Sequence, residues 1–389
     1  MSRTEAAVLS RRSRLSARLR EDGLFACVLE DFEHLRTSHV RYLSGHPSDA
    51  ILVVAATGES VLVPWDVNLA AERARVDRVV PYTDFKRSYK EAVATVLKSL
   101  GMPEGNSGAK ARVEFLPRTS HLRFEELRKE LAGVEVVLRG DGIDTFLSKM
   151  RSLKDDEEIA ALERAAAITD EVLALVEREL RSKSAGGIRE VDVAQLVERE
   201  ALARGAEGTG FETLAAGPTR SWGIHAFPAY SAGPFGGTGL SILDFGVKVD
   251  GCTSDVTATF ARGPLDADQE RMLALVQTAY DASVAAAVSG ASPKAPAIAA
   301  DQVFEAAGWK MPHALGHGIG LDSHEAPLLR STGENPDREL AAGMVFTIEP
   351  GLYRPDLGGV RLENDVLIDG RGTAPVARVL TRSRIVRLG

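Results

Sequence analysis

Residues 313–327 read His-Ala-Leu-Gly-His-Gly-Ile-Gly-Leu-Asp-Ser-His-Glu-Ala-Pro and contain three of the eight histidines of the chain, His313, His317 and His324. Glycines flank His317 on both sides. Because glycine has no side chain, the backbone and the imidazole can approach another group closely there. A single histidine in a Gly-rich turn commonly caps or hydrogen-bonds locally. Three together, with acidic residues in the strands before and after them, indicate a ligand site.

A second informative segment precedes this cluster. Residues 240–260 hold two β-rich runs that flank Asp250-Gly251, and this dipeptide is a strong hairpin signal. Pairing about that turn puts Asp244 and Asp255 directly opposite or diagonal to each other on one face, depending on the register. Two buried neighbouring carboxylates repel unless a proton or a cation lies between them. A metal is therefore predicted here, with a hydrogen bond near a sheet edge as the alternative for Asp244.

Two glutamates follow the histidine cluster in β-like runs. Residues 344–349 end in Glu349, and residues 360–368 contain Glu363. In both runs the glutamate interrupts or ends a strand where the pattern predicts a core residue, although an exposed strand face would also accommodate it.

Two aspartates, an imidazole and two glutamates form a hard oxygen and nitrogen ligand set, which suits manganese, cobalt, iron or zinc. Four carboxylate charges would be balanced by two divalent cations. Such a pair, ~3.5–4 Å apart, can share a bridging water and lower its pKa, so this ligand set predicts hydrolysis.

Composition narrows the class of protein further. The net charge of −8 disfavours nucleic acid and anionic membranes as partners. The two cysteines, Cys27 and Cys252, are too few for a disulfide framework or a thiolate zinc cluster. The N-terminal residues lack the apolar core of a signal peptide, and no later run approaches ~18 uninterrupted apolar residues. These features predict a cytoplasmic protein.

The 389 residues are expected to form more than one domain. Alternating strand and helix patterns predict a compact α/β domain over residues 1–145. Residues 139–152 are interpreted as a connection, and a long helix is predicted to begin near Asp155, inside a second domain of residues 146–389. Residues 208–239 are Gly-rich and are predicted to form a long loop, a candidate rim or lid.

The second domain resembles the pita-bread metallopeptidases, a family that includes methionine aminopeptidase, aminopeptidase P and prolidase. The segments that carry the resemblance occur in the family's order and are Ile-Leu-Asp-Phe-Gly with Thr-Ser-Asp-Val-Thr, Gly-His-Gly-Ile-Gly-Leu with His-Glu-Ala-Pro, Ile-Glu-Pro-Gly, and Gly-Val-Arg-Leu-Glu. The first domain and residues 149–159 resemble the prolidase, aminopeptidase P and creatinase branch. This resemblance implies a creatinase-like α/β N-terminal domain followed by an α+β pita-bread catalytic domain, and it suggests a homodimer.

The resemblance also implies a set of metal ligands. Two divalent ions, manganese in the first place with cobalt or zinc as alternatives, would be held by Asp244, Asp255, His317, Glu349 and Glu363. Asp255 and Glu363 would bridge the two ions. At two other positions the chain departs from the family: Ala258 replaces a frequent arginine and Cys252 a frequent tyrosine. These departures concern substrate handling and leave the five ligand positions intact.

Further site residues are carried over in the same way. His225 and His324 would hold the substrate and stabilise charge on the scissile carbonyl. His313 would line the pocket beside them, and Arg361 matches an arginine near the bridging glutamate. Glu349 would also manage the proton of the bridging water.

The activity that the resemblance implies is cleavage of the bond before proline in short peptides. Xaa-Pro dipeptides are the favoured substrates, and aminopeptidase P activity on longer peptides is the alternative. By position in the Gly-rich segment, Trp222, His225, Phe227 and Tyr230 are expected to form walls for the proline ring. Two rival interpretations are a creatinase-like amidinohydrolase, which works without metal, and a non-catalytic pita-bread module that binds peptides or proteins. Both typically lack the full ligand set that this chain keeps.

Overall fold

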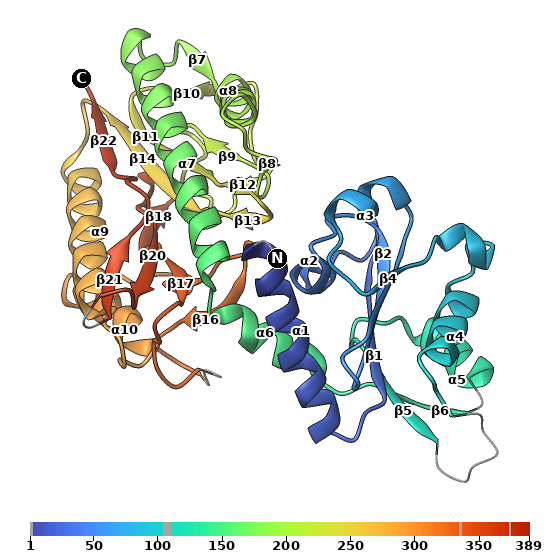
Figure 1. Ribbon diagram of the computed structural model, residues 1–389. Coiled ribbons are helices and arrows are strands. Elements are labelled where there is room, and N and C mark those ends of the chain that lie inside the picture. Colours follow the sequence, from blue (N-terminus) through green and yellow to red (C-terminus); the bar gives the residue numbers. More distant parts are fainter. Residues whose placement is uncertain (1–2, 104–109, 132, 334–336, 373–374) are drawn as a thin grey trace. The chain divides into compact units, whose positions relative to one another are not determined.

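The computed structural model describes residues 3–103, 110–131, 133–333, 337–372 and 375–389. The chain divides into two compact units, Met1–Met150 and Arg151–Gly389 (Figure 1). In the described part of the chain, no helix is long and apolar enough to cross a membrane.

The first unit is built on a mixed six-stranded sheet with the strand order β4-β3-β2-β1-β5-β6. Its strands are β1 (Ala26–Asp31), β2 (Ala50–Ala55), β3 (Ser60–Pro64), β4 (Arg78–Val79), β5 (Ala111–Phe115) and β6 (Val134–Val137). Strands β2 and β3 pair antiparallel as a hairpin. Strand β1 then pairs parallel with β5, and β5 pairs parallel with β6.

The helices of this unit alternate with its strands. They are α1 (Arg3–Glu21), α2 (Ser38–Ser44), α3 (Val67–Arg73), the 3-10 helix η1 (Tyr82–Phe85), α4 (Tyr89–Ser99), α5 (His121–Glu130) and α6 (Ile143–Ser152). Apolar side chains of α4 and α5, such as Val93, Leu97 and Leu127, join a buried cluster with the strands. Burial of this apolar surface is the main stabilising contribution. The predicted α/β class is confirmed for this unit.

Residues 139–152, interpreted as a connection into the second domain, do contain the boundary between the two units, but most of the stretch is helical and forms α6. The segment is polar overall, but Ile143, Leu147 and Met150 are buried. Their spacing puts them on one helix face. The predicted long helix follows as α7 (Asp156–Ser182), and the side chain of Asp155 caps its N-terminus by accepting a hydrogen bond from the Glu158 amide.

The described residues of the second unit form two larger sheets and three small ones; one larger sheet is mixed, because β22 pairs parallel with β14, and the strand pairs of the other are antiparallel. Its strands are β7 (Ile188–Arg189), β8 (Gly208–Thr209), β9 (Leu214–Ala216), β10 (Pro234–Phe235), β11 (Gly239–Phe245), β12 (Val247–Val249), β13 (Cys252–Thr253), β14 (Val256–Arg262), β15 (Gly316–Gly318), β16 (Glu325–Leu329), β17 (Val345–Ile348), β18 (Gly351–Arg354), β19 (Gly358–Arg361), β20 (Asn364–Asp369), β21 (Val376–Val379) and β22 (Ile385–Leu388). The larger sheets have the orders β22-β14-β11-β9 and β16-β15-β17-β20-β21. The small ones are β13-β12-β8, β18-β19 and β10-β7.

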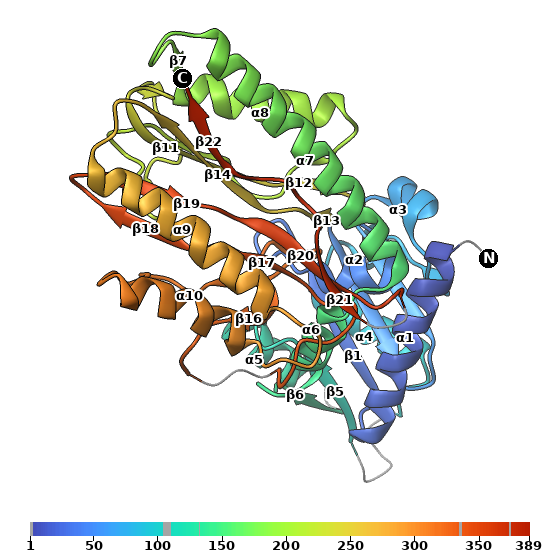
Figure 2. The same cartoon turned by 90° about the vertical axis from the view of Figure 1, so that its left-hand side faces the viewer.

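The helices of the second unit cover these strands from two sides. Besides α7 they are α8 (Glu190–Ala203), α9 (Ala267–Ala286) and α10 (Lys294–Ala306). Figure 2 shows α7 and α8 on one side of the strands and α9 and α10 on the other. Two buried apolar clusters match this arrangement, one under α7 and α8 and one under α9 and α10. The strands that carry the acidic residues lie between these two cores.

The Gly-rich segment of residues 208–239 is not one continuous loop. It contains the short strands β8, β9 and β10. Strand β9 pairs with β11, with Ala216 opposite Ile242 and Leu214 opposite Asp244. The loop prediction is therefore corrected in these places, and the irregular part reduces to shorter connections such as residues 217–233.

Candidate active site

The hairpin signal at Asp250-Gly251 is confirmed. Both residues have positive φ, +48° and +86°, and they join β12 to β13 as a two-residue loop with Val249 opposite Cys252. Positive φ at both central positions is the geometry of the type I′ turn that matches strand twist. On the adjacent sheet, Asp244 in β11 lies opposite Thr257 in β14. Asp255 directly precedes β14, so the diagonal relationship to Asp244 holds.

The glycines beside His317 serve close packing of strands. His317 is the central residue of β15, which pairs with β16 and β17. A Cβ atom at Gly316 would lie 2.1 Å from the Thr347 carbonyl oxygen, and one at Gly318 would lie 2.0 Å from the Ala326 carbonyl oxygen. No side chain fits at such distances, so only glycine lets the three backbones approach and present the imidazole.

Both glutamates stand where a strand ends. Glu349 follows β17 directly, and Glu363 lies between β19 and β20 and forms an isolated bridge with Thr257. The Thr257 hydroxyl donates a hydrogen bond of 2.6 Å to Glu363 Oε2. The Thr347 hydroxyl is 3.4 Å from Glu349 Oε1. Neighbouring strands therefore orient these carboxylates.

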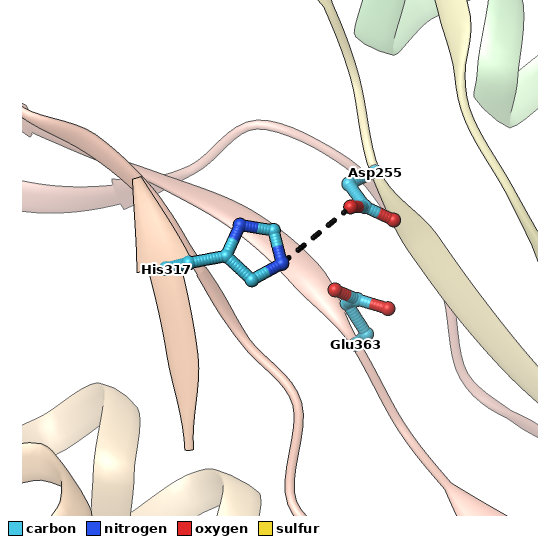
Figure 3. Close-up of side chains that lie close together, drawn as sticks. All are labelled: Asp255, His317 and Glu363. Atoms are coloured by element: carbon cyan, nitrogen blue, oxygen red, sulfur yellow. Dashed lines mark ion pairs between the residues drawn. The ribbon is translucent and has the colours of Figure 1, made fainter. Parts of the chain in front are cut away.

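A cavity of about 470 Å³ brings the predicted site residues together. All five assigned metal ligands line it, and so do the histidines and the arginine assigned as substrate contacts, namely His225, Asp244, Asp255, His313, His317, His324, Glu349, Arg361 and Glu363. Ligand atoms of Asp255, His317 and Glu363 all lie within 4.8 Å of one another (Figure 3). Asp244 and Glu349 line the same cavity outside this tight group.

The electrostatics of the cavity suit a cation. Burial, and next the nearby Glu363, raise the pKa of Asp255 well above its usual range. Burial and the same neighbour raise the pKa of Glu349, and burial with Asp244 raises the pKa of Glu363 to about 7. Without a compensating charge these groups would hold protons. Divalent cations would remove the repulsion, which is the physical reason that such a donor set fits metal.

His317 is neutral and keeps a free lone pair on Nε2, which also suits a metal ion. Its Nδ1 is 3.1 Å from the Gly318 carbonyl oxygen, which can only accept, so Nδ1 carries the hydrogen. The lone pair of Nε2 then faces Asp255 Oδ2 at 3.8 Å (Figure 3). It also lies 3.5 Å from Glu349 Oε1. Burial lowers the pKa of His317 to about 4, so the ring is neutral near neutral pH. A neutral imidazole whose free nitrogen points at carboxylates is arranged as a metal ligand.

Arg361 connects Asp244 to a residue that the sequence did not single out, Tyr353. The Arg361 guanidinium donates to Asp244 Oδ2 and, over 3.0 Å, to the Tyr353 hydroxyl oxygen. The hydroxyl is in turn 3.1 Å from His313 Nε2. His313 Nδ1 lies 2.7 Å from the Ala314 carbonyl oxygen, so Nδ1 donates and Nε2 accepts from Tyr353. A chain of hydrogen bonds therefore links His313 through Tyr353 to the Asp244 carboxylate, with Arg361 as the donor to both Tyr353 and Asp244.

His324 and His225 are both exposed residues at the cavity. The His324 ring stacks on His317 with centroids 4.0 Å apart and an interplanar angle of 29°. Of the four walls expected for a proline ring, His225 and Phe227 line the cavity. Trp222 and Tyr230 are not among its described lining residues, so their assignment as walls stays a prediction. Phe227 is 97% exposed, which puts it at the mouth.

Comparisons with known proteins agree with this geometry. Residues 160–370 match metallopeptidase family M24, and residues 11–152 match the creatinase/prolidase N-terminal domain. An Xaa-Pro dipeptidase of Pyrococcus horikoshii is 30% identical over 343 residues, which span 87% of this chain and 90% of that protein. A putative dipeptidase of Bacillus subtilis is 33% identical over 258 residues, 66% of this chain and 68% of that one.

Solved structures extend the likeness to nearly the whole chain. The prolidase from Pyrococcus furiosus superposes with a TM-score of 0.78 and 26% identity, covering 95% of this chain and 99% of that chain. The predicted architecture, a creatinase-like α/β domain followed by an α+β pita-bread catalytic domain, is confirmed. With the family matched over more than half of its length and a metal-type donor set in the cavity around His317, the chain belongs to metallopeptidase family M24.

Proposed function

We propose that this protein hydrolyses the peptide bond before proline in short peptides, most of all Xaa-Pro dipeptides, and that it depends on two divalent metal ions. The observation that carries the proposal is the convergence of Asp255, His317 and Glu363 within 4.8 Å in a buried cavity. The names of the Pyrococcus relatives, Xaa-Pro dipeptidase and prolidase, support the substrate class.

The residues that would hold the metals are Asp244, Asp255, His317, Glu349 and Glu363, all within the proposed catalytic domain of residues 146–389. Manganese is the first expectation, with cobalt or zinc as alternatives, because the donors are oxygen and nitrogen atoms. When bound, such ions supply Lewis-acid activation of water and of the substrate carbonyl. The buried Asp244 Oδ1, for which the described residues provide no hydrogen-bond partner, supports a further ligand at that atom.

The remaining residues of the cavity would bind, orient and exchange protons. Burial lowers the pKa of His313 to about 4, so it would act as a neutral contact fixed by Tyr353. His225 and His324 would donate hydrogen bonds to the scissile carbonyl as negative charge develops. Arg361 would hold the Asp244 carboxylate in place. Glu349 is the proposed general base, because its carboxylate lines the cavity and its Oε1 lies 3.5 Å from Nε2 of the proposed ligand His317.

Proline explains why a dedicated pocket is needed. It has a rigid ring and no amide hydrogen, so peptidases that bind that hydrogen cannot act at this bond. Apolar side chains in the cavity, including Leu214, Ile224 and Phe227, offer a surface for the ring. Aminopeptidase P activity on longer peptides is the alternative within the same family.

From the sequence we further propose a homodimer in the cytoplasm. Both cysteines are free and buried, as a reducing compartment allows.

The test is hydrolysis of Ala-Pro, Leu-Pro, Ala-Pro-Ala and Ala-Ala by the manganese-loaded protein. The proposal expects rapid release of proline from the first two peptides. Preference for Ala-Pro-Ala would assign the protein to aminopeptidase P. Rapid cleavage of Ala-Ala with no cleavage of the proline peptides would refute the substrate class. Absence of any hydrolysis, together with stoichiometric peptide binding, would instead favour a binding module.

A further inference from the structure

A buried ion network lies directly beside His324. The Glu325 carboxylate accepts hydrogen bonds from Arg151 Nη2 and, at 2.9 Å, from Lys154 Nζ. The three side chains are nearly inaccessible, with exposed fractions of 5% for Glu325, 5% for Arg151 and 0% for Lys154. Arg151 and Lys154 come from the end of α6 and the link to α7. None of the three is among the described residues that line the cavity around His317.

The network restrains the residues on both sides of His324. Strands β15 and β16 pair with Gly318 opposite Glu325, so residues 319–324 form the connecting loop and His324 is its last residue. Glu325 Oε1 accepts a hydrogen bond of 3.0 Å from the Asp322 backbone amide. The Asp322 carboxylate accepts one of 2.7 Å from Arg151. One cation and one carboxylate therefore restrain the residues on both sides of His324.

The loop also wraps around the buried carboxylate. A Cβ atom at Gly320 would lie 2.8 Å from both oxygens of Glu325, so this glycine lets the loop backbone pack against the charge. The Gly320 carbonyl oxygen accepts a 2.8 Å hydrogen bond from the Thr253 amide, which ties the loop to β13. Lys154 Nζ additionally donates to the Arg151 carbonyl oxygen over 2.7 Å. Among the described residues, hydrogen bonds therefore hold the loop near its beginning at Gly320, at its centre at Asp322, and at its end at Glu325.

Stability alone is a poor explanation for this arrangement. Removing three charged side chains from water carries a desolvation cost that their mutual attraction often fails to exceed, and well-packed apolar side chains can be equally stable. A buried charge network does, however, fix geometry sharply, because charge-assisted hydrogen bonds are short and directional. What this network fixes is the position of a histidine that stacks on His317.

We propose that Arg151, Lys154 and Glu325 are positioning residues that hold His324 at the reacting end of the cavity. The inference rests on the proposed function, because it assumes that His324 contacts the substrate. A shift of about 1 Å in a group that contacts the reacting atoms can cost up to ~100-fold in rate. Loss of the network should therefore lower kcat through His324 and should leave the metal content unchanged.

The experiment combines kinetics with hydrogen exchange on the full-length protein. Glu325→Gln keeps the volume of the side chain and removes its charge. We expect kcat for Ala-Pro to fall roughly 10- to 100-fold with a smaller change in KM. Amide exchange in a peptide covering residues 319–325 should become faster, because the Asp322 amide loses a charged acceptor. Glu270→Gln, which breaks an exposed pair with Arg387, is the matched control and should change neither quantity.

A double-mutant cycle tests whether the effect passes through His324. In a His324→Ala background, Glu325→Gln should have little further effect on kcat. An equal loss in both backgrounds would overturn the proposal, and so would faster exchange with an unchanged kcat. If Glu325→Gln does not fold, Lys154→Met is put through the same cycle, since it removes one donor and retains Arg151. If the unsubstituted protein cleaves no Xaa-Pro peptide, the proposed function fails, whereas unchanged exchange in Glu325→Gln would overturn the positioning role independently.

Discussion

Arg361 Nη2 donates a hydrogen bond of 2.5 Å to Asp244 Oδ2, while Asp244 Oδ1 is buried without a hydrogen-bond partner among the described residues. One oxygen of this carboxylate is thus neutralised by a buried guanidinium, and the other is free to meet a ligand. Arg361 therefore holds the Asp244 carboxylate through Oδ2, and Oδ1 is available for a ligand.

Arg361→Met should therefore destabilise the metal-free protein more than the metal-loaded protein. Removing one partner of a buried ion pair costs about 3–5 kcal/mol because the other charge is left uncompensated, and a bound cation would compensate for part of that loss. The measurement is thermal unfolding with chelator and with manganese, for the unsubstituted protein and the variant. Equal destabilisation under both conditions would show that Arg361 does not neutralise Asp244.

The metal content should be about two divalent ions per chain, because four carboxylates converge on one cavity. Elemental analysis after dialysis against manganese measures this directly. In Asp255→Ala at least one ion should be lost, since Asp255 belongs to the tight group with His317 and Glu363. Retention of both ions by Asp255→Ala would remove it from the ligand set.

His324→Ala should lose turnover, whereas Asp255→Ala should lose bound metal. His324 stacks on His317 at the exposed end of the cavity, so the variant should keep its ions and lose turnover. A reduction of about 100-fold or more in kcat is expected by analogy with the removal of an oxyanion donor. Metal analysis and steady-state kinetics on the same preparation separate the two roles, and loss of metal from His324→Ala would reverse the assignment.

The first unit should lose stability in mild acid because of His46. This side chain is fully buried, and burial lowers its pKa more than the nearby Asp66 carboxylate raises it. The folded protein therefore holds His46 neutral, while the unfolded chain binds a proton below about pH 6.5. The contribution of neutral His46 to the free energy of unfolding is complete above that pH. It is lost as the pH falls towards the pKa of His46 in the folded protein.

The corresponding measurement is the melting temperature near neutral pH and in mild acid. His46→Leu should reduce the acid-induced decrease in melting temperature, and the exposed His121→Leu serves as the matched surface control. An unchanged pH dependence in His46→Leu would assign the acid sensitivity to other groups.

Much of the site could be predicted from local patterns. Asp250-Gly251 marks a two-residue hairpin by its conformational preference, and the glycines beside His317 mark a close approach of strands. Glu349 and Glu363 interrupt or end apolar runs in which an unpaired charge would be costly. These signals are strong because each depends on residues that are adjacent in the sequence.

Other features depend on contacts between distant segments. Tyr353 becomes part of the site because the β18–β19 hairpin sets it between His313 and Arg361, and its neighbours in the sequence give no sign of this. Arg151 and Lys154 reach Glu325 from more than 170 residues away. Helix α6 was detectable in principle, since Ile143, Leu147 and Met150 follow a helical period, but its polar residues concealed that pattern.

The most direct test of the central claim follows proline release from Ala-Pro through one cycle of metal removal and restoration. We expect hydrolysis by the manganese-loaded protein, none after exhaustive chelation, and recovery when manganese is added back. Ala-Ala, assayed in parallel, should stay intact throughout. Undiminished hydrolysis of Ala-Pro by protein that elemental analysis shows to be free of metal would contradict the account.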